Sequence, residues 1–529
     1  MLKLTMTGLY IAWVLKYKER LILVLSIVIL LFLVKDSHMI RSVAYDQSPE
    51  SNFLDEYTNI WHGLSIRTSG VPAAWSDLRS YWDFRPKREG EIGGGLELQG
   101  FNIYRENTKP ALFPSRNFPE LTIYTTEFDF GDGKRHTSLM QPYLDHPPFG
   151  AIVLSLLVPK TSDNFYKITP FDSRKTSIWL ADLSTILIFL LGFQIFKNPL
   201  FGLISAAIYT SVPTYFFISR LALLENVLIP TQLISLNFIV FALNKPKINL
   251  NLYRLLLVIS GIFAGLAFLS KTTGIAVTLA GVIILVLYKE RFKGILFFLL
   301  PAVFVSLVYF VWGMVMSPNL FPSLLAEQSS KRIFVGSLNF IPATFKYGAK
   351  SFPIDGWWFG GFLSLIFLQY NKQLLPLIVS ILAMLFVILF SGASSFPWYF
   401  IPLVPFLSIA TANLFWNIAT NPNLIQILIL FLIFFSSTYF WSIGVFSASP
   451  NFINHQGQFF LYKIMLSIFF VAAAVAPFLH KRSYLFRIIW FIAIFLLIYV
   501  LIKWNFKSLF YMMQHWGKLI ENFSPNWKL

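Results

Sequence analysis

Residues 253–288 read YRLLLVISGIFAGLAFLSKTTGIAVTLAGVIILVLY. Two apolar runs, 253–270 and 273–288, are separated only by Lys271 and Thr272. About twenty apolar residues in a helix cross the hydrocarbon core of a bilayer. The 529-residue chain repeats this pattern, with 56% hydrophobic and 13% charged residues and a mean hydropathy of +0.64. Soluble proteins carry about 25% charged residues. We therefore expect a polytopic α-helical membrane protein.

The apolar runs give a span count. A first run, Leu21–Val34, follows basic residues and lacks a small-residue cleavage site behind it, so we interpret it as a signal-anchor helix. The run 149–158 is too short to span, and we expect a juxtamembrane or re-entrant helix there. The other expected spans bring the total to about thirteen crossings: 176–196, 200–218, 224–243, 253–270, 273–288, 294–315, 357–370, 374–391, 397–417, 424–446, 458–479 and 485–503.

Basic residues orient these helices. If 149–158 does not span the membrane, the basic residues of the short loops all fall on the same side of the membrane. The positive-inside rule identifies that side as the cytoplasm. The loops 36–175 and 316–356 then face outward, and the compact loops favour a prokaryotic inner (plasma) membrane.

We divide the chain into 1–35 (anchor), 36–175 (external segment), 176–420 (bundle with the external loop 316–356) and 421–529 (further helices and a tail). The cytoplasmic cations are Lys197, Lys245, Lys247, Lys289, Arg291, Lys293, Lys372, Lys481 and Arg482.

The first external segment has the composition of a small α+β unit. Glycine pairs and prolines mark turns, and Leu121–Tyr124 alternates as a short strand does. We expect 82–139 to be a β-rich insertion that binds the acceptor. The chain has no cysteine, which excludes a disulfide framework and a cysteine nucleophile. The net charge of +17 is explained by the cytoplasmic loops, so we expect no nucleic-acid partner.

Acidic residues are scarce in the bundle, and four of them, Asp182, Glu225, Glu327 and Asp355, lie toward its outer face, whereas Glu290 lies among the cytoplasmic cations. Of 25 Asp and Glu residues, six follow Asp172: Asp182, Glu225, Glu290, Glu327, Asp355 and Glu521. Two cations, Arg220 and Lys271, also fall at outer helix ends. Ionisable groups in apolar surroundings are functional suspects, although snorkelling of basic side chains is an alternative explanation. Cations there suit a phosphate, and a lipid-linked phosphate is a natural ligand.

Several motifs carry a family resemblance. Leu54–Thr58 (LDEYT) resembles the Asp-Glu motif that opens the first external loop of GT-C glycosyltransferases, membrane enzymes that use polyprenyl-phosphate sugars. Asp145–Gly150 (DHPPFG) and Ser219–Glu225 (SRLALLE) are similar to segments of protein O-mannosyltransferases. Leu269–Gly274 (LSKTTG) resembles a Lys-Gly helix break that they share with lipid A aminoarabinose transferases, and Trp398–Pro405 (WYFIPLVP) a later Tyr-x-x-Pro-Leu-x-Pro segment. The resemblance covers about residues 15–420 and implies the GT-C architecture.

The resemblance implies inverting transfer of one sugar from a polyprenyl phosphate to an acceptor hydroxyl. Asp55 would be the general base, with Glu56 beside it. The donor phosphate would be bound by Arg220 and Lys271, with His146 and Arg67 as weaker candidates. Carboxylates could orient these groups or hold a divalent metal ion, and the candidate ligands are Asp145, Glu225 and Glu327. The chain departs from the aminoarabinose transferases here, because their Glu-His pair, which helps hold a metal, is replaced by Glu327-Gln328.

The sequence is also compatible with two other functions. A transporter or lipid flippase with an external domain would place ionisable groups near the bilayer midplane, on broken helices within repeated halves. A non-catalytic scaffold that binds envelope glycans would tolerate replacement of Asp55. For a transferase, the sequence predicts a lipid-linked sugar donor and a protein, lipid or glycan acceptor as partners, and leaves the identity of the sugar open.

Overall fold

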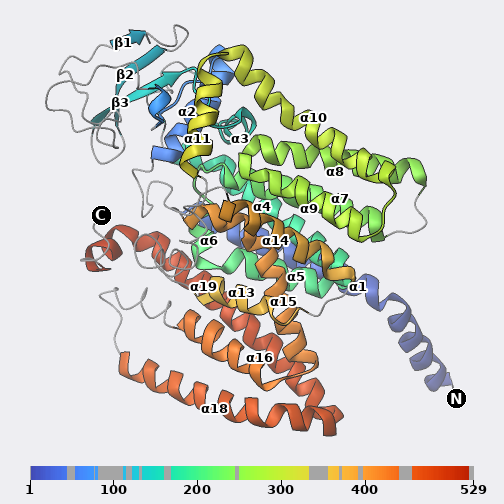
Figure 1. The fold of residues 1–529 in the computed structure, drawn as a ribbon. Helices are drawn as coiled ribbons and strands as arrows, with labels where there is room; N and C mark the ends of the chain where they lie inside the picture. Colours follow the sequence, from blue (N-terminus) through green and yellow to red (C-terminus); the bar gives the residue numbers. More distant parts are fainter. Residues whose placement is uncertain are drawn as a thin grey trace.

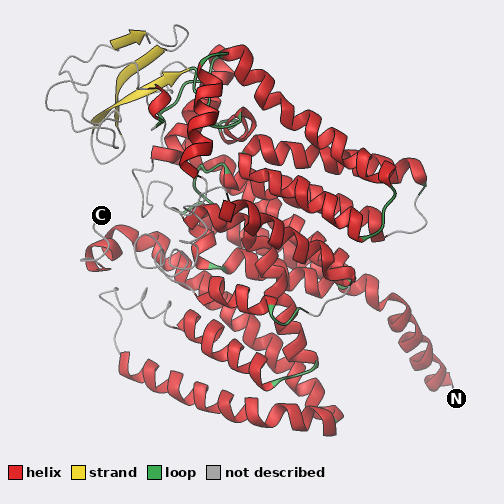
Figure 2. Cartoon of the chain, in the orientation of Figure 1, coloured by secondary structure: helices red, strands yellow, loops and turns green. Residues whose placement is uncertain are grey.

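The computed structural model describes residues 2–43, 54–76, 78–81, 111–114, 122–129, 134–159, 168, 170–244, 249–332, 356–368, 372–390, 397–439 and 455–523. Within these ranges the chain is almost entirely helical, with one small sheet (Figure 2). Figure 1 shows the sheet at one end of the helical body, beside α2, α3 and α11. The expected architecture, a helical membrane protein with an α+β first loop, is confirmed.

Nine helices among the described residues are long and apolar enough to cross a membrane. Three shorter apolar helices, Pro199–Ser211, Thr272–Leu287 and Leu424–Tyr439, accompany them. The expected total of about thirteen crossings therefore stays a prediction. The nine spans lie in α1 (Leu2–Arg41), α4 (Pro170–Phe196), α7 (Glu225–Asn244), α8 (Leu250–Ser270), α10 (Phe292–Met316), η6–α14 (Lys372–Leu374 and Leu375–Phe390), η7–α15 (Pro397–Leu403 and Val404–Thr420), α18 (His455–Arg482) and α19 (Tyr484–Phe523).

Shorter elements connect and cover these helices. The run expected to be non-spanning is α3 (Pro148–Leu154), a helix of seven residues, which confirms that interpretation. The first external segment also contributes α2 (Leu54–Ser69) and η1 (Arg79–Tyr81), and the second contributes α11 (Leu320–Arg332). The remaining elements are α5 (Pro199–Ser211), α6 (Pro213–Ile218), η4 (Thr272–Gly274), α9 (Ile275–Leu287), α13 (Gly356–Leu365), α16 (Leu424–Ile429) and η8 (Leu430–Phe435).

The sheet is antiparallel, in the order β1 (Ala111–Pro114), β2 (Thr122–Asp129) and β3 (Lys134–Gln141). Strands β2 and β3 pair from Thr122–Gln141 to Asp129–Lys134. An isolated bridge between Ala74 and Met140 joins the end of the sheet to the segment after α2. The expected β-rich element is therefore present over its described residues, while 82–110 lie outside them.

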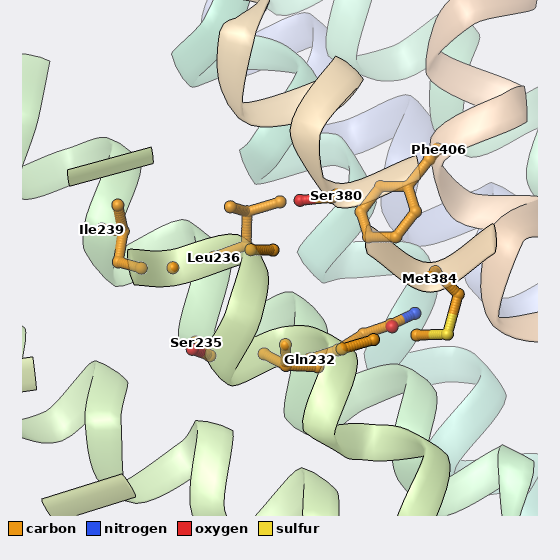
Figure 3. A pocket seen from close by; sticks show the side chains of 11 residues that line it. Gln232, Ser235, Leu236, Ile239, Ser380, Met384 and Phe406 are labelled. Atoms are coloured by element: carbon orange, nitrogen blue, oxygen red, sulfur yellow. The ribbon is translucent and has the colours of Figure 1, made fainter. Parts of the chain in front are cut away.

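One buried polar contact inside the bundle joins α7 to η7. Gln232 on α7 donates from Nε2 to the carbonyl oxygen of Pro402, 2.8 Å away. In a 3-10 helix such as η7, a carbonyl oxygen accepts from the N–H three residues later. That residue is Pro405, which has no N–H, so Gln232 of α7 donates to the Pro402 carbonyl instead. Beside Gln232 lies a cavity between α7, α9 and α14, with about 20 Å³ of internal space (Figure 3). That space suits one water molecule, not a lipid chain.

Candidate active site

Helix α2 begins with the two acids of the Asp-Glu motif. Acidic residues are favoured in a first helical turn by the helix dipole, and Asp55 and Glu56 occupy it. Glu56 is buried. Its carboxylate pairs with Arg174 of α4, with Nη2–Oε1 at 2.6 Å and Nε–Oε2 at 3.0 Å. The backbone N–H of Ala222 donates to the same carboxylate at 2.8 Å. Glu56 is therefore bound on both oxygens, whereas Asp55 next to it is half-buried.

The stretch between α6 and α7 is held directly on α2. Asn59 donates from Nδ2 to the carbonyl oxygen of Ala222 at 2.9 Å, so α2 binds both backbone groups of Ala222. Asn226 adds two bonds from Nδ2 to carbonyls of the same turn, those of Ile218 and Leu221. Arg220 lies two residues from Ala222, with only 1% of its surface exposed. The first turn of α2, which carries Asp55, is thus joined to the stretch that carries Arg220.

Lys271 lies where α8 breaks. It is the C-cap of α8 with an extended backbone (φ −158°, ψ 141°), and its ammonium pairs with the carboxylate of Glu225, the first residue of α7. The ammonium also lies over the ring of Tyr399, 3.8 Å from its centroid. A Cβ on Gly274 would come within 2.1 Å of the carbonyl oxygen of Ala267, so the tight turn after Lys271 requires glycine. Three separate motifs therefore meet at one ammonium group.

The Asp145–Gly150 motif places α3 between α2 and the end of α8. Pro147 is the N-cap of α3 and Pro148 its first residue, a position where proline is favoured. A Cβ on Gly150 would lie 2.5 Å from the carbonyl oxygen of Ser270 and 3.0 Å from Leu224. His146, just before this helix, is half-buried, with its ring centroid 6.4 Å from that of Tyr143. The glycine thus allows α3 to touch the residues next to Lys271 and Glu225.

Arg67 does not take the position expected for a phosphate ligand. It is twelve residues after Asp55, about 18 Å along the axis of α2. Its Nη1 donates to the carbonyl oxygen of Ser155 and, at 3.3 Å, to that of Val158. It therefore binds the carbonyls at the C-terminal end of α3, where cations are favoured, and the phosphate role is not supported.

The three carboxylates expected to hold a metal do not come together. Among the residues that the structure describes, no group of three His, Cys, Asp or Glu side chains is placed to bind a metal ion. Glu225 pairs with Lys271, Glu327 accepts hydrogen bonds from Ser80, and Asp145 accepts one from Ser76. Each carboxylate therefore has a different neighbour, and the residues present do not fit the expected site.

Sequence reasoning missed several charged residues that support the site. Arg41, at the end of α1, is fully buried and donates from Nε to Oγ of Ser219 at 2.9 Å. Its Nη1 is 3.6 Å from Oδ1 of Asp182, whose Oδ2 is 2.5 Å from Nδ1 of His38. Arg41 and Arg174 each flank an apolar run and so resemble ordinary flanking charges. Buried partners distinguish them, and these are visible only in three dimensions.

Comparisons with known proteins agree with this architecture. Residues 145–314 match a family model described as dolichyl-phosphate-mannose-protein mannosyltransferase. The fold is similar to that of ArnT from Cupriavidus metallidurans bound to undecaprenyl phosphate, at 14% identity and a TM-score of 0.51, over 95% of this chain and 81% of that one. No curated protein matches the chain. The likeness to ArnT shows the fold, and the match confirms the resemblance seen in the motifs.

Two further structures score lower. The apo state of ArnT aligns at 17% identity and a TM-score of 0.43, over 70% of this chain and 67% of that one. The Archaeoglobus fulgidus oligosaccharyltransferase in its apo form aligns at 12% identity and a TM-score of 0.41, over 87% and 55%.

Proposed function

We propose that this chain, which has the GT-C fold, is a glycosyltransferase that moves one sugar from a polyprenyl phosphate to an acceptor hydroxyl at the extracytoplasmic face. The observation that carries the proposal is the direct attachment of the first turn of α2 to the Arg220 stretch through Glu56, Asn59 and Ala222. It brings a half-buried carboxylate, Asp55, to a region that holds buried cations. A base and cations at one site are what transfer from a phosphate leaving group needs.

The chemistry is a single displacement. Asp55 accepts the proton of the acceptor hydroxyl while that oxygen forms a bond to the anomeric carbon. The bond from this carbon to the phosphate oxygen breaks, and the electron pair leaves with the polyprenyl phosphate. Arg220 and Lys271 offset the negative charge that develops on the leaving group. One displacement inverts the anomeric configuration, and no acid is needed because the leaving group is already a stable anion.

Glu56 has a different role from its neighbour. Since both of its oxygens are bound by Arg174 and Ala222, it acts as a positioning residue that holds the first turn of α2. Glu225 has the same relation to Lys271, since their pairing fixes the ammonium group at the end of α7. His146, on the turn before α3, is a further candidate for contact with the phosphate.

The test uses purified protein in nanodiscs with two labelled probes, undecaprenyl phosphomannose and undecaprenyl phosphoglucose. Wild type is expected to release undecaprenyl phosphate from one of them, slowly without acceptor. Asp55→Asn is expected to lower release about 100-fold or more, with donor binding kept. The control is Asp172→Asn, which removes the charge of a partly exposed carboxylate that pairs with Lys175 of its own helix. Full activity of Asp55→Asn would remove the base assignment, and lipid translocation without release would favour a flippase.

A further inference from the structure

The second external segment is fastened to the first by hydrogen bonds from adjacent residues of α11. Glu327 accepts two bonds at Oε2, one from the backbone N–H of Ser80 at 2.7 Å and one from its hydroxyl at 2.8 Å. Gln328 donates from Nε2 to the carbonyl oxygen of Asp145 at 2.9 Å. Residues 80 and 145 are far apart in sequence, so α11 bridges two parts of the first external segment.

The backbone of Leu144, next to Asp145, is bound by two tyrosine hydroxyls. The hydroxyl of Tyr81 accepts from the backbone N–H of Leu144 at 2.8 Å, and the hydroxyl of Tyr309 donates to the carbonyl oxygen of Leu144 at 2.8 Å. Burial and then the nearby Asp145 carboxylate raise the pKa of Tyr81 well above its usual range. Tyr81 therefore stays protonated and can donate to Asp145 while it accepts from Leu144. The backbone immediately before His146 is bound by residues of η1, α10 and α11.

The chemistry of this junction does not suit a cation. An amide nitrogen such as Nε2 of Gln328 is a hydrogen-bond donor and offers no lone pair to a metal ion. Ser80 uses both of its donors on Glu327, and Ser76 donates to the side chain of Asp145. Below these bonds lies an apolar cluster that includes Leu78, Leu144, Phe321 and Leu324. The junction is built from hydrogen-bond donors matched to acceptors over an apolar base.

We propose that these bonds form a metal-independent clamp, made of Ser80, Asp145, Glu327 and Gln328, that fixes α11 on the first external segment. By holding the carbonyl of Asp145, the clamp sets the position of His146 at the edge of the site. Glu327 and Gln328 are thus positioning residues for the turn 144–146. The clamp itself does not depend on the proposed function, whereas its effect on sugar transfer does.

Because the chain has no cysteine, the clamp can be tested with introduced thiols. The Ser80→Cys/Glu327→Cys double variant, treated with a short bifunctional thiol cross-linker in nanodiscs, is expected to form an internal cross-link, which reports that α11 lies against η1. The control pair is Ser80→Cys/Ser329→Cys, because Ser329 lies two positions along α11, is exposed and points to another side of the helix. Metal independence is tested with the clamp intact: the wild-type protein is expected to have the same melting temperature with and without EDTA. Absence of the specific cross-link, or a lower wild-type melting temperature in EDTA, would overturn the proposal.

Kinetics then test positioning. Gln328→Leu is expected to lower the turnover number about tenfold, with the KM for the labelled undecaprenyl phosphosugar kept within about threefold, because a displaced group near the reacting atoms affects the rate more than binding. Glu327→Gln, which keeps an acceptor oxygen for Ser80, is expected to retain most activity, and Glu327→Ala is not. Ser329→Ala is the control. Wild-type turnover in both Gln328→Leu and Glu327→Ala would refute positioning. No wild-type turnover would refute the proposed function and leave the cross-linking result standing.

Discussion

At the scale of single residues, two adjacent acids in α2 differ because their surroundings differ. Glu56 is fixed by Arg174 and the Ala222 backbone, whereas Asp55 one position earlier is half-buried. Successive residues of a helix are about 100° apart and do not face the same neighbours. The Asp-Glu motif thus combines a half-buried carboxylate, Asp55, with a buried one, Glu56, that anchors the first turn of α2.

The buried pair gives a stability prediction. Glu56→Gln removes the charge that pairs with the guanidinium of Arg174 in a site where both side chains are nearly inaccessible. Breaking a buried pair from one side destabilises by about 3–5 kcal/mol. We expect a clear fall in the melting temperature of the detergent-solubilised protein. The control, Asp172→Asn, removes a partly exposed pair worth less than about 1 kcal/mol. Equal melting temperatures for the two variants would contradict the anchoring role.

His62 gives a pH prediction. It is fully buried on α2, with its ring centroid 4.9 Å from that of Tyr143, and burial lowers its pKa to about 3. Below about pH 6.5, His62 binds a proton in the unfolded chain but stays neutral in the folded chain. The contribution of neutral His62 to folding stability is therefore complete above about pH 6.5 and is lost as the pH falls toward about 3. The loss is on the order of 1 kcal/mol per pH unit. In melting curves from pH 7 to 4, His62→Phe is expected to fall less steeply than wild type, and parallel curves would refute this.

The sequence predicted these residues unevenly. Arg220, Lys271 and Glu225 were identified because ionisable side chains at the end of an apolar run are conspicuous. Arg41 and Arg174 escaped notice because a cation flanking a span is ordinary, and only a buried partner reveals another role. Arg67 was assigned to the phosphate because it follows a motif closely in sequence, yet the length of α2 carries it to the far end of the helix.

At the scale of elements, α3 is a wedge whose glycine contacts position the site. Gly63 of α2 lies so close to α3 that a Cβ would come within 1.9 Å of the carbonyl oxygen of Ala151, and Gly150 faces Ser270 in the same way. These two contacts bring α2, α3 and the end of α8 together. A shift of α3 would therefore move both the helix that carries Asp55 and the helix end that carries Lys271.

A larger side chain at the wedge should separate these elements. Gly150→Ala is expected to destabilise by about 1–3 kcal/mol, since the obstacle is a backbone carbonyl that cannot move aside cheaply, and to lower sugar transfer more than donor binding. Gly294→Ala is the matched control, because its closest contact would be the flexible carboxylate end of Glu290, at 3.1 Å, and its next contacts lie at 3.8 Å or more. Thermal melting and transfer rates compare the two. An active, stable Gly150→Ala variant would show that the close contact is dispensable.

Elements with a clear local pattern were predicted well. The run 149–158 is too short and too proline-flanked to span, and it forms a short helix. The strand expected at 121–124 lies in β2. Helix α1 is longer than the apolar run at both ends: it begins at Leu2, and its last turns are joined to α4 through His38 and to Ser219 through Arg41. The role of α11 was missed because its contacts lie with residues distant in sequence.

At the scale of the whole molecule, α2, α3 and α11 lie together at one end of the helical body (Figure 1), and polar contacts join α2 to Arg174 and Ala222. Several long helices remain largely exposed in the isolated chain: only 17% of the apolar window of Phe292–Met316 and of Tyr462–Arg482 is buried. Large exposed apolar side chains such as Phe304, Val315 and Phe478 suit contact with lipid tails. We therefore expect the polar contacts at the end with α2, α3 and α11 to lie at one membrane face.

The orientation can be measured in the cysteine-free chain. Ser69→Cys, on exposed residue 69 at the end of α2, is expected to react with a membrane-impermeant maleimide added outside whole cells. Lys481→Cys, in the last turn of α18, is expected to react only after the membrane is opened, since basic residues at span ends stay in the cytoplasm. The reverse pattern of labelling would place the site on the cytoplasmic side.

The central claim is that a lipid-linked phosphate binds between Arg220 and Lys271, beside Asp55. The most direct measurement is an experimental structure of the protein in nanodiscs with undecaprenyl phosphate bound. We predict phosphate oxygens about 3 Å from the Arg220 guanidinium and the Lys271 ammonium, with the Asp55 carboxylate facing the same space. A phosphate bound at the opposite membrane face, or in contact with neither cation, would contradict it.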